Sequence, residues 1–419
     1  MMLAVGHKGG LTTLFDAATG ETRWEVQAPA WPAAPPAPRP RPAYRRFTRN
    51  PVAMSPDGRF VASAESGKRR DRTLLRDAQT SSVCMTTADH DGAGACICRE
   101  DDEGRLWVQP ACPVEVHASE VEVMQFSPCG QTLATGDSSG GVILWDVLTG
   151  KAKFRTESVD YAAFADVGCV SSLSFSADGA RLAGVVSDDW ATLAVWETST
   201  GGLVQCWYFG EWLQGYSTQM EYWLNDNYVV DSMQFNPGSN SVLAMTLRGG
   251  GEDVVEWWDL DSGKMQVQVS EHMSGPLVFS ADGRSLAAVW DADSVCVYRC
   301  GEPLSSQTFT QDVVFVPVAD PGIQMPGMLL SADGSMLAMS RNNGSVVLVN
   351  AWTGQLLRTV EQGLVGRTER CACLACGPDW ATVTQRGSAF AMGHHPRLGA
   401  ASRVLLLDAG VLRMILDRV

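Results

Sequence analysis

Residues 117–151 read HASEVEVMQFSPCGQTLATGDSSGGVILWDVLTGK, and this stretch decides the fold. Apolar residues alternate through 123–127, and two further strand patterns follow at 132–135 and 142–145. The chain then has to reverse at Asp146–Gly150, where Asp can bond its own downstream backbone and Gly accepts a positive φ. The stretch therefore predicts a small antiparallel sheet whose strands follow one another in the chain.

The turn between the first two of these strands recurs along the whole sequence. Its form is Ser, Pro or Ala, usually Asp, then Gly, and it is found at Ser55–Gly58, Ser127–Gly130, Ser176–Gly179, Ser280–Gly283 and Ser331–Gly334. Weaker copies are Asn236–Gly238 and Gly377–Asp379. The spacing lies near the period of roughly 40 to 50 residues that is typical of propeller blades.

The Asp146–Gly150 corner recurs as well. Related corners are found at Asp16–Gly20, Glu197–Gly201, Asp259–Gly263 and Asn350–Gly354, with a weaker copy at Asp77–Thr80. Two turn signatures that alternate in register predict a ring of repeated antiparallel sheets, an all-β propeller. An ordinary β-sandwich is the alternative, but it would not repeat its turns.

These motifs resemble the WD-repeat family of β-propellers, most closely in Val116–Lys151, where Trp145-Asp146 is the dipeptide that names the family. The resemblance implies blades of four antiparallel strands and structural roles for matching residues, here His117, Thr135, Trp145, Asp146, Trp196, Trp258 and Asp259. The family's buried hydrogen-bond set joins His, Ser or Thr, Asp and Trp. Ser139 occupies the position where that Asp is expected, so we expect an incomplete set in this blade. Such residues identify a fold and no chemistry.

The repeats give an expected blade count. We place units near 1–27, 50–80, 81–119, 120–160, 166–206, 229–270, 273–305, 326–360 and 369–419. The first unit lacks an inner strand, so eight blades plus a fragment fit best, and a seven-bladed ring with 81–119 as a degenerate unit is the rival. The fragment could join the C-terminal unit and close the ring, or it could mark the end of a longer protein.

Composition agrees with a globular domain. The chain has 419 residues, of which 45% are hydrophobic and 19% charged. The apolar run at Met1–Val5 is too short for a cleavable signal, and no run approaches the roughly 18 apolar residues that span a membrane. We expect the protein in the cytoplasm, with the nucleus or the cytoskeleton as alternatives.

Twelve cysteines raise the question of metals and disulfides. Candidate ligands cluster near the C-terminus at Cys371, Cys373, Cys376, His394 and His395. Their spacing differs from zinc fingers and ribbons, which use paired Cys-x-x-Cys, so we expect buried thiols and no metal or cofactor. The same holds for Cys96 and Cys98. Scattered cysteines without a secretion signal favour a reducing compartment.

A basic arm interrupts an otherwise acidic chain. Residues 29–76 contain 11 Lys/Arg and 3 Asp/Glu, whereas the whole chain has a net charge of −15. Within it, a Pro/Arg-rich insertion at 28–49 carries Arg39, Arg41, Arg45, Arg46 and Arg49 on a polyproline-like course. The insertion is either a solvated loop or a docking segment for an acidic protein surface or a proline-reading module. Nucleic acid is disfavoured as a partner because the rest of the chain is acidic.

A second insertion, at 207–228, is rich in aromatic residues. Eight of the chain's 34 aromatic residues fall within 206–228. The candidate contact residues are Trp207, Tyr208, Phe209, Trp212, Tyr216, Tyr222 and Trp223. They either pack on the side of the propeller or form an exposed interface, because Trp and Tyr dominate protein contact sites.

Catalytic motifs are lacking in the sequence. It contains no phosphate-binding loop, no His-Glu-x-x-His and no Gly-x-Ser-x-Gly elbow. Asp16–Trp24 resembles the blade corner of quinoprotein dehydrogenases, but it occurs once, so a quinone enzyme is a minor alternative. We expect a non-catalytic scaffold that binds other proteins within a multi-subunit assembly, of which cytoskeletal or ciliary assemblies are examples. An RNA-binding propeller that uses the 29–76 arm is the other alternative.

Overall fold

The computed structural model describes residues 2–7, 11–27, 51–65, 72–89, 95–100, 106–108, 117, 119–156, 168–187, 191–209, 229–248, 254–270, 275–291, 294–300, 314–317, 327–331, 333–340, 345–360 and 371–377. Within these ranges every regular element is a β-strand. The chain is therefore all-β over its described length, as the sequence predicts.

The strands are short and evenly spaced. In chain order they are β1 (Met2–His7), β2 (Leu11–Asp16), β3 (Thr22–Gln27), β4 (Val52–Met54), β5 (Phe60–Glu65), β6 (Arg72–Asp77), β7 (Val83–Asp89), β8 (Ala95–Glu100), β9 (Leu106–Val108), β10 (Val121–Phe126), β11 (Thr132–Asp137), β12 (Val142–Asp146), β13 (Ala152–Thr156), β14 (Cys169–Phe175), β15 (Arg181–Ser187), β16 (Ala191–Glu197), β17 (Leu203–Phe209), β18 (Val229–Phe235), β19 (Val242–Arg248), β20 (Val254–Asp259), β21 (Lys264–Ser270), β22 (Leu277–Phe279), β23 (Ser285–Asp291), β24 (Ser294–Arg299), β25 (Val314–Pro317), β26 (Met328–Leu330), β27 (Met336–Ser340), β28 (Val346–Asn350), β29 (Leu356–Val360) and β30 (Cys371–Gly377).

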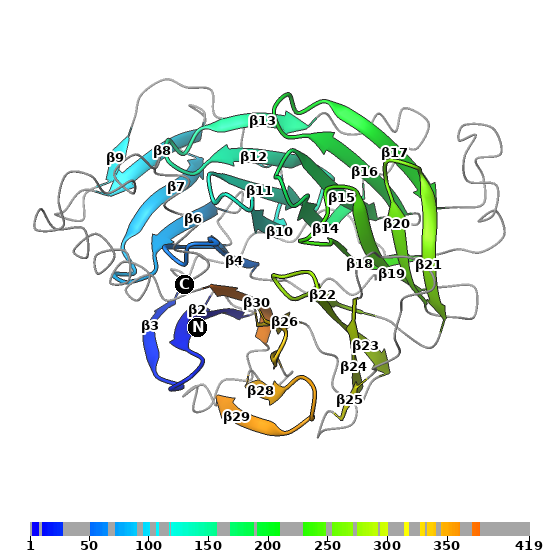
Figure 1. Cartoon of the computed structure of the whole chain (residues 1–419). Coiled ribbons are helices and arrows are strands. Elements are labelled where there is room, and N and C mark those ends of the chain that lie inside the picture. Colours follow the sequence, from blue (N-terminus) through cyan, green and yellow to red (C-terminus); the bar gives the residue numbers. More distant parts are fainter. Residues whose placement is uncertain are drawn as a thin grey trace, which may run out of the picture.

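These strands form seven antiparallel sheets, which we call blades 1 to 7. From the innermost strand outward they are β30-β1-β2-β3, β4 to β9, β10 to β13, β14 to β17, β18 to β21, β22 to β25 and β26 to β29. The innermost strands contact one another in sequence from β4 through β26 to β30, and β30 contacts β4, so the sheets close into a ring (Figure 1). The structure is the seven-bladed alternative, and the expected count of eight is corrected.

Blade 2 explains the difference in count. The segment predicted as a separate unit at 81–119 instead extends the sheet of β4 to β6, because β7 pairs with β6, β8 with β7, and β9 with β8. The corner at Asp77–Thr80 is followed by β7 as an outer strand, as each such corner is in the other blades. The later strands β8 and β9 then lie outside the ring.

Blade 1 joins the two ends of the described chain. β30 pairs antiparallel with β1 from Met2↔Gly377 to His7↔Cys371 and supplies the innermost strand that 1–27 lacks. Figure 1 shows β30 beside the dark-blue strands β1 and β2. This pairing removes the two free sheet edges that an open ring would leave.

The recurrent turns have the geometry that their residues predict. Ser55 Oγ donates to Asp57 Oδ1 at 2.6 Å and accepts from the Phe60 backbone N–H at 2.9 Å. The same pair of bonds is found at Ser176, Ser280 and Ser331. In the weak corner after Asp77, Ser81 has a φ of 60°, the positive value that Gly has in the other corners. That corner is therefore strained where the others are not.

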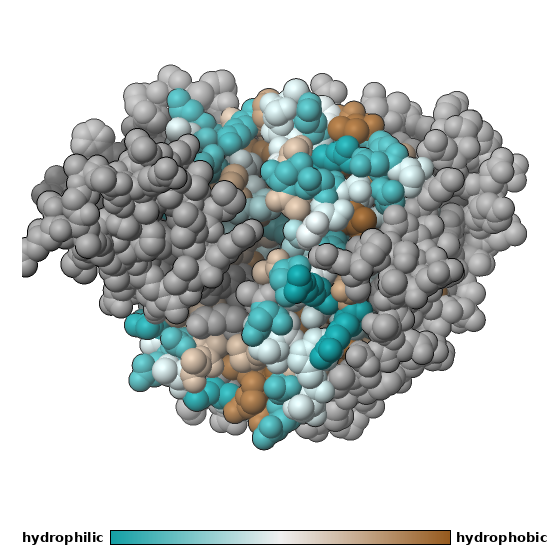
Figure 2. Space-filling view, viewed as in Figure 1, coloured by the Kyte–Doolittle hydropathy of each residue, from teal (hydrophilic) through white to brown (hydrophobic). Residues whose placement is uncertain are grey.

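The core is divided among the junctions between blades. One buried cluster joins blade 4 to blade 5, another joins blade 2 to blade 3, and a third packs Leu3, Val5 and Phe15 of blade 1 on Ala338 and Leu348 of blade 7. On the face in Figure 2 the described residues are mostly hydrophilic, with small brown areas between them. The buried apolar side chains of these clusters therefore pack adjacent blades against each other.

Candidate functional site

A connected set of buried polar side chains lies in blade 3. His117 precedes β10, and its Nδ1 is 2.9 Å from Asp137 Oδ2 while its Nε2 is 2.6 Å from Thr135 Oγ1. Trp145 Nε1 donates to the same Thr135 Oγ1 at 2.8 Å. Because an indole N–H can only donate and a carboxylate can only accept, Thr135 Oγ1 accepts from Trp145, and His117 Nδ1–H donates to Asp137. The set joins the entry of the blade to β11 and β12.

The hydrogen-bond set is complete, which corrects the expectation drawn from Ser139. Asp137, two residues earlier, supplies the carboxylate because it ends β11 and the chain turns back at once to Gly141. Its Oδ1 accepts from Ser139 N at 2.9 Å, Ser139 Oγ at 2.8 Å and Gly141 N at 2.8 Å. The carboxylate thus comes from position 137 and not from position 139, where the resemblance places it, and both carboxylate oxygens keep a donor.

The pKa of Asp137 reports this environment. Burial acts to raise the pKa, but the hydrogen bond and charge of His117, with the bonds from Gly141 and Ser139, outweigh burial and hold it below its usual value. A buried carboxylate that accepts several hydrogen bonds stays ionised for this reason. The set is therefore a structural one, a network of buried side chains centred on the His117 ring and the Asp137 carboxylate.

The register shows which residues take the Trp145 position in the other blades. Because Trp145 pairs with Leu133, the equivalents are read from the matching pairs as Phe15, Arg76, Trp196, Trp258, Tyr298 and Val349. The residue at the Thr135 position changes with them. In blade 4 it is Gly184, where a Cβ would lie 2.7 Å from the Trp196 ring, so the ring occupies the space of the missing side chain.

In blade 5 a carboxyl group accepts the hydrogen bond of the tryptophan N–H. Met245 takes the Thr135 position, and Trp258 Nε1 donates instead to Glu256 Oε2 at 2.8 Å. Glu256 is fully buried, and burial raises its pKa to about 7 while the Trp258 hydrogen bond acts in the opposite direction. The sequence prediction missed Glu256, although an acidic residue two positions before Trp-Asp in an apolar strand is visible in Val254–Asp259.

The corner aspartates serve the turns between the outer two strands. Asp146 Oδ1 accepts from Thr149 N at 2.8 Å and Thr149 Oγ1 at 2.9 Å. Asp259 accepts from Asp261 N at 3.1 Å and from Ser262 Oγ at 2.9 Å. Both carboxylates are therefore engaged within their own turns.

One position on the outer strands contacts the next blade repeatedly, and we call it the latch position. It holds Trp24, Phe154, Gln205 and Arg358, which pair with Leu14, Leu144, Val195 and Leu348. Trp24 Nε1 donates to Ala78 O at 2.8 Å, and Gln205 Nε2 donates to Leu260 O at 3.2 Å. In both cases the acceptor lies in the corner of the following blade, so this position fastens adjacent blades together.

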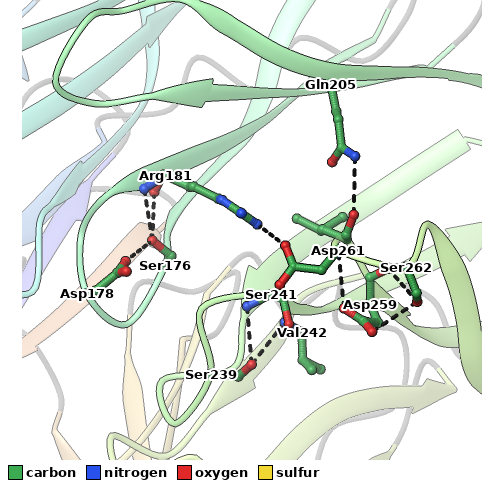
Figure 3. A network of polar contacts seen from close by, with 11 residues as sticks. Ser176, Asp178, Arg181, Gln205, Ser239, Ser241, Val242, Asp259, Asp261 and Ser262 are labelled. Atoms are coloured by element: carbon green, nitrogen blue, oxygen red, sulfur yellow. Dashed lines mark hydrogen bonds and ion pairs between the residues drawn. The ribbon is translucent and has the colours of Figure 1, made fainter.

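The junction between blades 4 and 5 carries further polar contacts (Figure 3). Arg181 Nη1 lies 2.7 Å from Asp261 Oδ1, and Asp178 N donates to Asn240 Oδ1 at 2.8 Å. Both Arg181 and Asp261 are partly exposed, so the ion pair contributes little stability by itself. The pair joins the start of β15 to the corner of blade 5, where Gln205 also donates to Leu260 O.

The structure separates the aromatic candidates. The predicted insertion at 207–228 begins too early, because Leu203–Phe209 form β17. Trp207 is only 4% exposed and belongs to the core cluster between blades 4 and 5, which removes it from the candidate contacts. The backbones of Tyr208 and Phe209 pair with Thr192 and Ala191.

The other predicted contact residues lie outside the described residues. These are Trp212, Tyr216, Tyr222 and Trp223 and all five arginines of the 28–49 insertion, Arg39, Arg41, Arg45, Arg46 and Arg49. His394 and His395 lie outside as well, while Cys371, Cys373 and Cys376 belong to β30 and Cys96 and Cys98 to β8.

The described residues contain neither a cluster of metal ligands nor a helix that could span a membrane. Over the described ranges no three His, Cys, Asp or Glu side chains are grouped so that they could hold a metal ion. In the same part of the chain, no helix has the length and apolar character needed to cross a membrane.

Exposed aliphatic pairs were not found from the sequence. Leu203 and Val204 start β17, and Leu356 and Leu357 start β29 at the equivalent register, each about half exposed. The signal that could have found them is two consecutive aliphatic residues just after a corner, where blades 1 and 3 have Thr22-Arg23 and Ala152-Lys153.

Comparisons with known proteins agree with this architecture. Residues 110–146 match the family model described as "WD domain, G-beta repeat". The β-propeller domain of Cps50 (Swd1) from Myceliophteria thermophila superposes with a TM-score of 0.55 at 15% identity, covering 78% of this chain and 90% of that chain. Among curated proteins, none matches the sequence. The matched repeat, its buried hydrogen-bond set and the closed ring of seven blades show a β-propeller that carries a WD repeat at residues 110–146.

Proposed function

We propose that this propeller is a non-catalytic scaffold that binds other proteins as a subunit of a larger assembly. The observation that carries the proposal is the use of the polar side chains. The connected set of His117, Thr135, Asp137 and Trp145 is buried and paired within its own blade, so it offers no reactive atom to a substrate. The corner carboxylates are likewise engaged in turns.

Three surfaces are candidates for the partner. The first is the part of the aromatic insertion that follows β17, residues 210–228, because residues 207–209 belong to the strand itself. The second is the Pro/Arg-rich insertion at 28–49, whose charge suits an acidic protein surface. The third consists of the aliphatic pairs that start β17 and β29. Exposed apolar and aromatic residues are typical of protein contact sites.

A reducing compartment such as the cytoplasm fits the thiols. Cys129 and Cys300 are free thiols in the part of the chain that the structure describes. Burial, with the nearby Asp282 charge, raises the pKa of Cys300 to about 12, so this thiol stays protonated and unreactive. Disulfides are typical of oxidising compartments.

Affinity capture from lysate with quantitative mass spectrometry tests the proposal. The intact chain is compared with a Trp212→Ser/Trp223→Ser variant and with a Leu356→Ser/Leu357→Ser variant. Trp207 is left unchanged because Ser at that core position would disturb folding. Circular dichroism and the unfolding midpoint first establish that each variant folds.

The outcomes separate the surfaces. Partners lost only with the tryptophan variant place the contact on the aromatic insertion, and partners lost only with the leucine variant place it on β29. Nuclease treatment before capture separates protein contacts from contacts made through RNA bound by the 29–76 arm. If the intact folded chain recovers no protein above an unrelated propeller, the scaffold proposal is wrong.

A further inference from the structure

Glu256 is a buried acidic side chain with one oxygen unpaired. It is 0% exposed, its Oε2 accepts from Trp258 Nε1 at 2.8 Å, and its Oε1 has no hydrogen-bond partner in the described part of the chain. Native proteins pair nearly all buried polar atoms, so an exception of this kind calls for a physical reason.

The surroundings of Glu256 are apolar and belong to two blades. Val254 and Trp258 lie two positions to either side on the same face of β20, and both are in the core cluster that joins blades 4 and 5. Blade 4 contributes Leu193 and Trp207 to this cluster. Glu256 therefore lies at the junction of the two blades, on the side that faces blade 4.

No described charge compensates the carboxyl group there. The ionisable residues of the strands packed around it are Arg181, Glu197, Cys206, Tyr208, Asp231, Arg248, Asp259 and Lys264. The residues opposite Glu256 on the neighbouring strands are Met245 and Gln268, neither of which is ionisable. Arg181 pairs with Asp261 at the corner, Glu197 accepts from Thr200 Oγ1, and Asp231 accepts from Gly275 N toward blade 6. Cys206 packs toward blade 3.

The protonation state of Glu256 decides how well this junction tolerates it. A protonated carboxyl keeps its carbonyl oxygen for the Trp258 N–H and brings no charge into the cluster. An ionised carboxylate needs water or a donor at Oε1, and burial without either disfavours it. The free-energy cost of ionising Glu256 therefore falls when the contact between the blades opens and water reaches the carboxylate.

We propose that Glu256 makes the junction between blades 4 and 5 pH-sensitive, closed when the carboxyl is protonated and loosened when it ionises. The strand β17, which brings Trp207 into the junction, continues directly into residues 210–228. Loosening would then change how the aromatic insertion is presented to a partner, a consequence that rests on the proposed function.

The sign and size of the effect follow from linkage. Burial raises the pKa of Glu256 from 4.5 to about 7, so its folded form holds the proton more tightly than its opened form. The contribution of Glu256 to stability is fully present below pH 4.5 and is lost as pH rises toward 7. Between pH 6 and pH 8 the population of the opened junction should rise by about tenfold.

Hydrogen exchange of the full chain measures this opening. Wild type, Glu256→Gln and the matched control Glu197→Gln are compared at pH 6 and pH 8 after correction for intrinsic exchange. Gln keeps the acceptor for Trp258 but cannot ionise, and Glu197 is an exposed corner residue. We expect peptides of β17, β19 and β20 to lose about tenfold protection at pH 8 in wild type and the control, and to be unchanged in Glu256→Gln.

A second variant keeps the test independent of that substitution. Trp258→Phe removes the donor that favours the ionised form, so the midpoint of the pH effect should move upward. Equal protection of wild type at both pH values, or the same pH effect in Glu256→Gln, overturns the proposal. Partner capture at pH 6 and pH 8 tests the consequence alone: equal capture with pH-dependent exchange overturns the link to the insertion and leaves the junction effect established.

Discussion

The guanidinium of Arg358 donates a 2.9 Å hydrogen bond from Nη2 to the backbone oxygen of Ala18, 340 residues away in the chain. Its Nη1 donates to the backbone oxygen of Thr19. Arg358 lies at the latch position of blade 7, and its acceptors lie in the corner of blade 1. The same position that fastens internal blades thus also fastens the two ends of the ring, beside the pairing of β30 with β1.

Replacing Arg358 by Met should lower the free energy of unfolding by about 1 kcal/mol, because it removes the hydrogen bonds of an exposed side chain while keeping most of its stem. Arg155→Met, which changes an exposed arginine on β13, is the matched control and should stay within about 0.5 kcal/mol of wild type. Urea unfolding followed by fluorescence measures both. Equal effects of the two substitutions would show that the latch at the seam contributes nothing specific.

The hydrogen-bond set of blade 3 predicts unequal effects for the two residues of its turn. Asp137→Ala leaves His117 buried without its partner and should lower the free energy of unfolding by about 3 kcal/mol or more. Ser139→Ala removes one hydroxyl donor from a carboxylate that keeps its other donors, so about 1 kcal/mol is expected. Thermal and urea unfolding check the order. The reverse order would mean that position 139 carries the set, as the family pattern alone suggests.

The sequence predicts the propeller because its turns are local: Ser55–Gly58 and Asp146–Gly150 fix their own geometry through bonds between residues a few positions apart. The blade count is not local, since whether β7 starts a new blade or completes one depends on its pairing with β6. Asp137 makes the contacts of the buried set from a position two residues before the one where the resemblance places the Asp, so the motif fails while the contacts form. Trp207 looked like part of an insertion because aromatic content does not reveal where a strand ends.

Blade 4 offers a test of how the Trp position depends on its neighbour. Gly184→Thr would restore the residue type that blade 3 has at Thr135, yet a Cβ there would lie 2.7 Å from the Trp196 ring. Overpacking of this kind costs about 1 to 3 kcal/mol, so the substitution should destabilise the protein. Gly184→Thr combined with Trp196→Leu should recover part of that loss, because the smaller side chain frees space. A stable single variant, measured by its unfolding midpoint, would contradict this packing.

Blade 1 contains a buried histidine without polar partners among the residues that the structure describes. His7 on β1 is fully buried, and neither of its ring nitrogens is hydrogen-bonded within that part of the chain. Burial lowers the pKa of His7 from 6.5 to about 4. Thr13 on β2, on the same face, is also buried, and its hydroxyl has no partner in the described chain. By register, His7 takes the place that Asp137 has in blade 3.

The protein should therefore lose stability in mild acid through His7. With a lowered folded pKa, the contribution is fully present above 6.5 and is lost as pH falls toward 4, by up to about 3 kcal/mol. His7→Leu cannot titrate, so the wild-type minus variant difference in unfolding free energy should slope across this window and level off outside it. Thr13→Val should stabilise by about 1 kcal/mol at every pH, because it removes an unpaired hydroxyl of similar shape. A pH-independent difference for His7→Leu would show that folding does not shift the pKa of the imidazole, and any loss of stability in acid would then belong to the carboxylates.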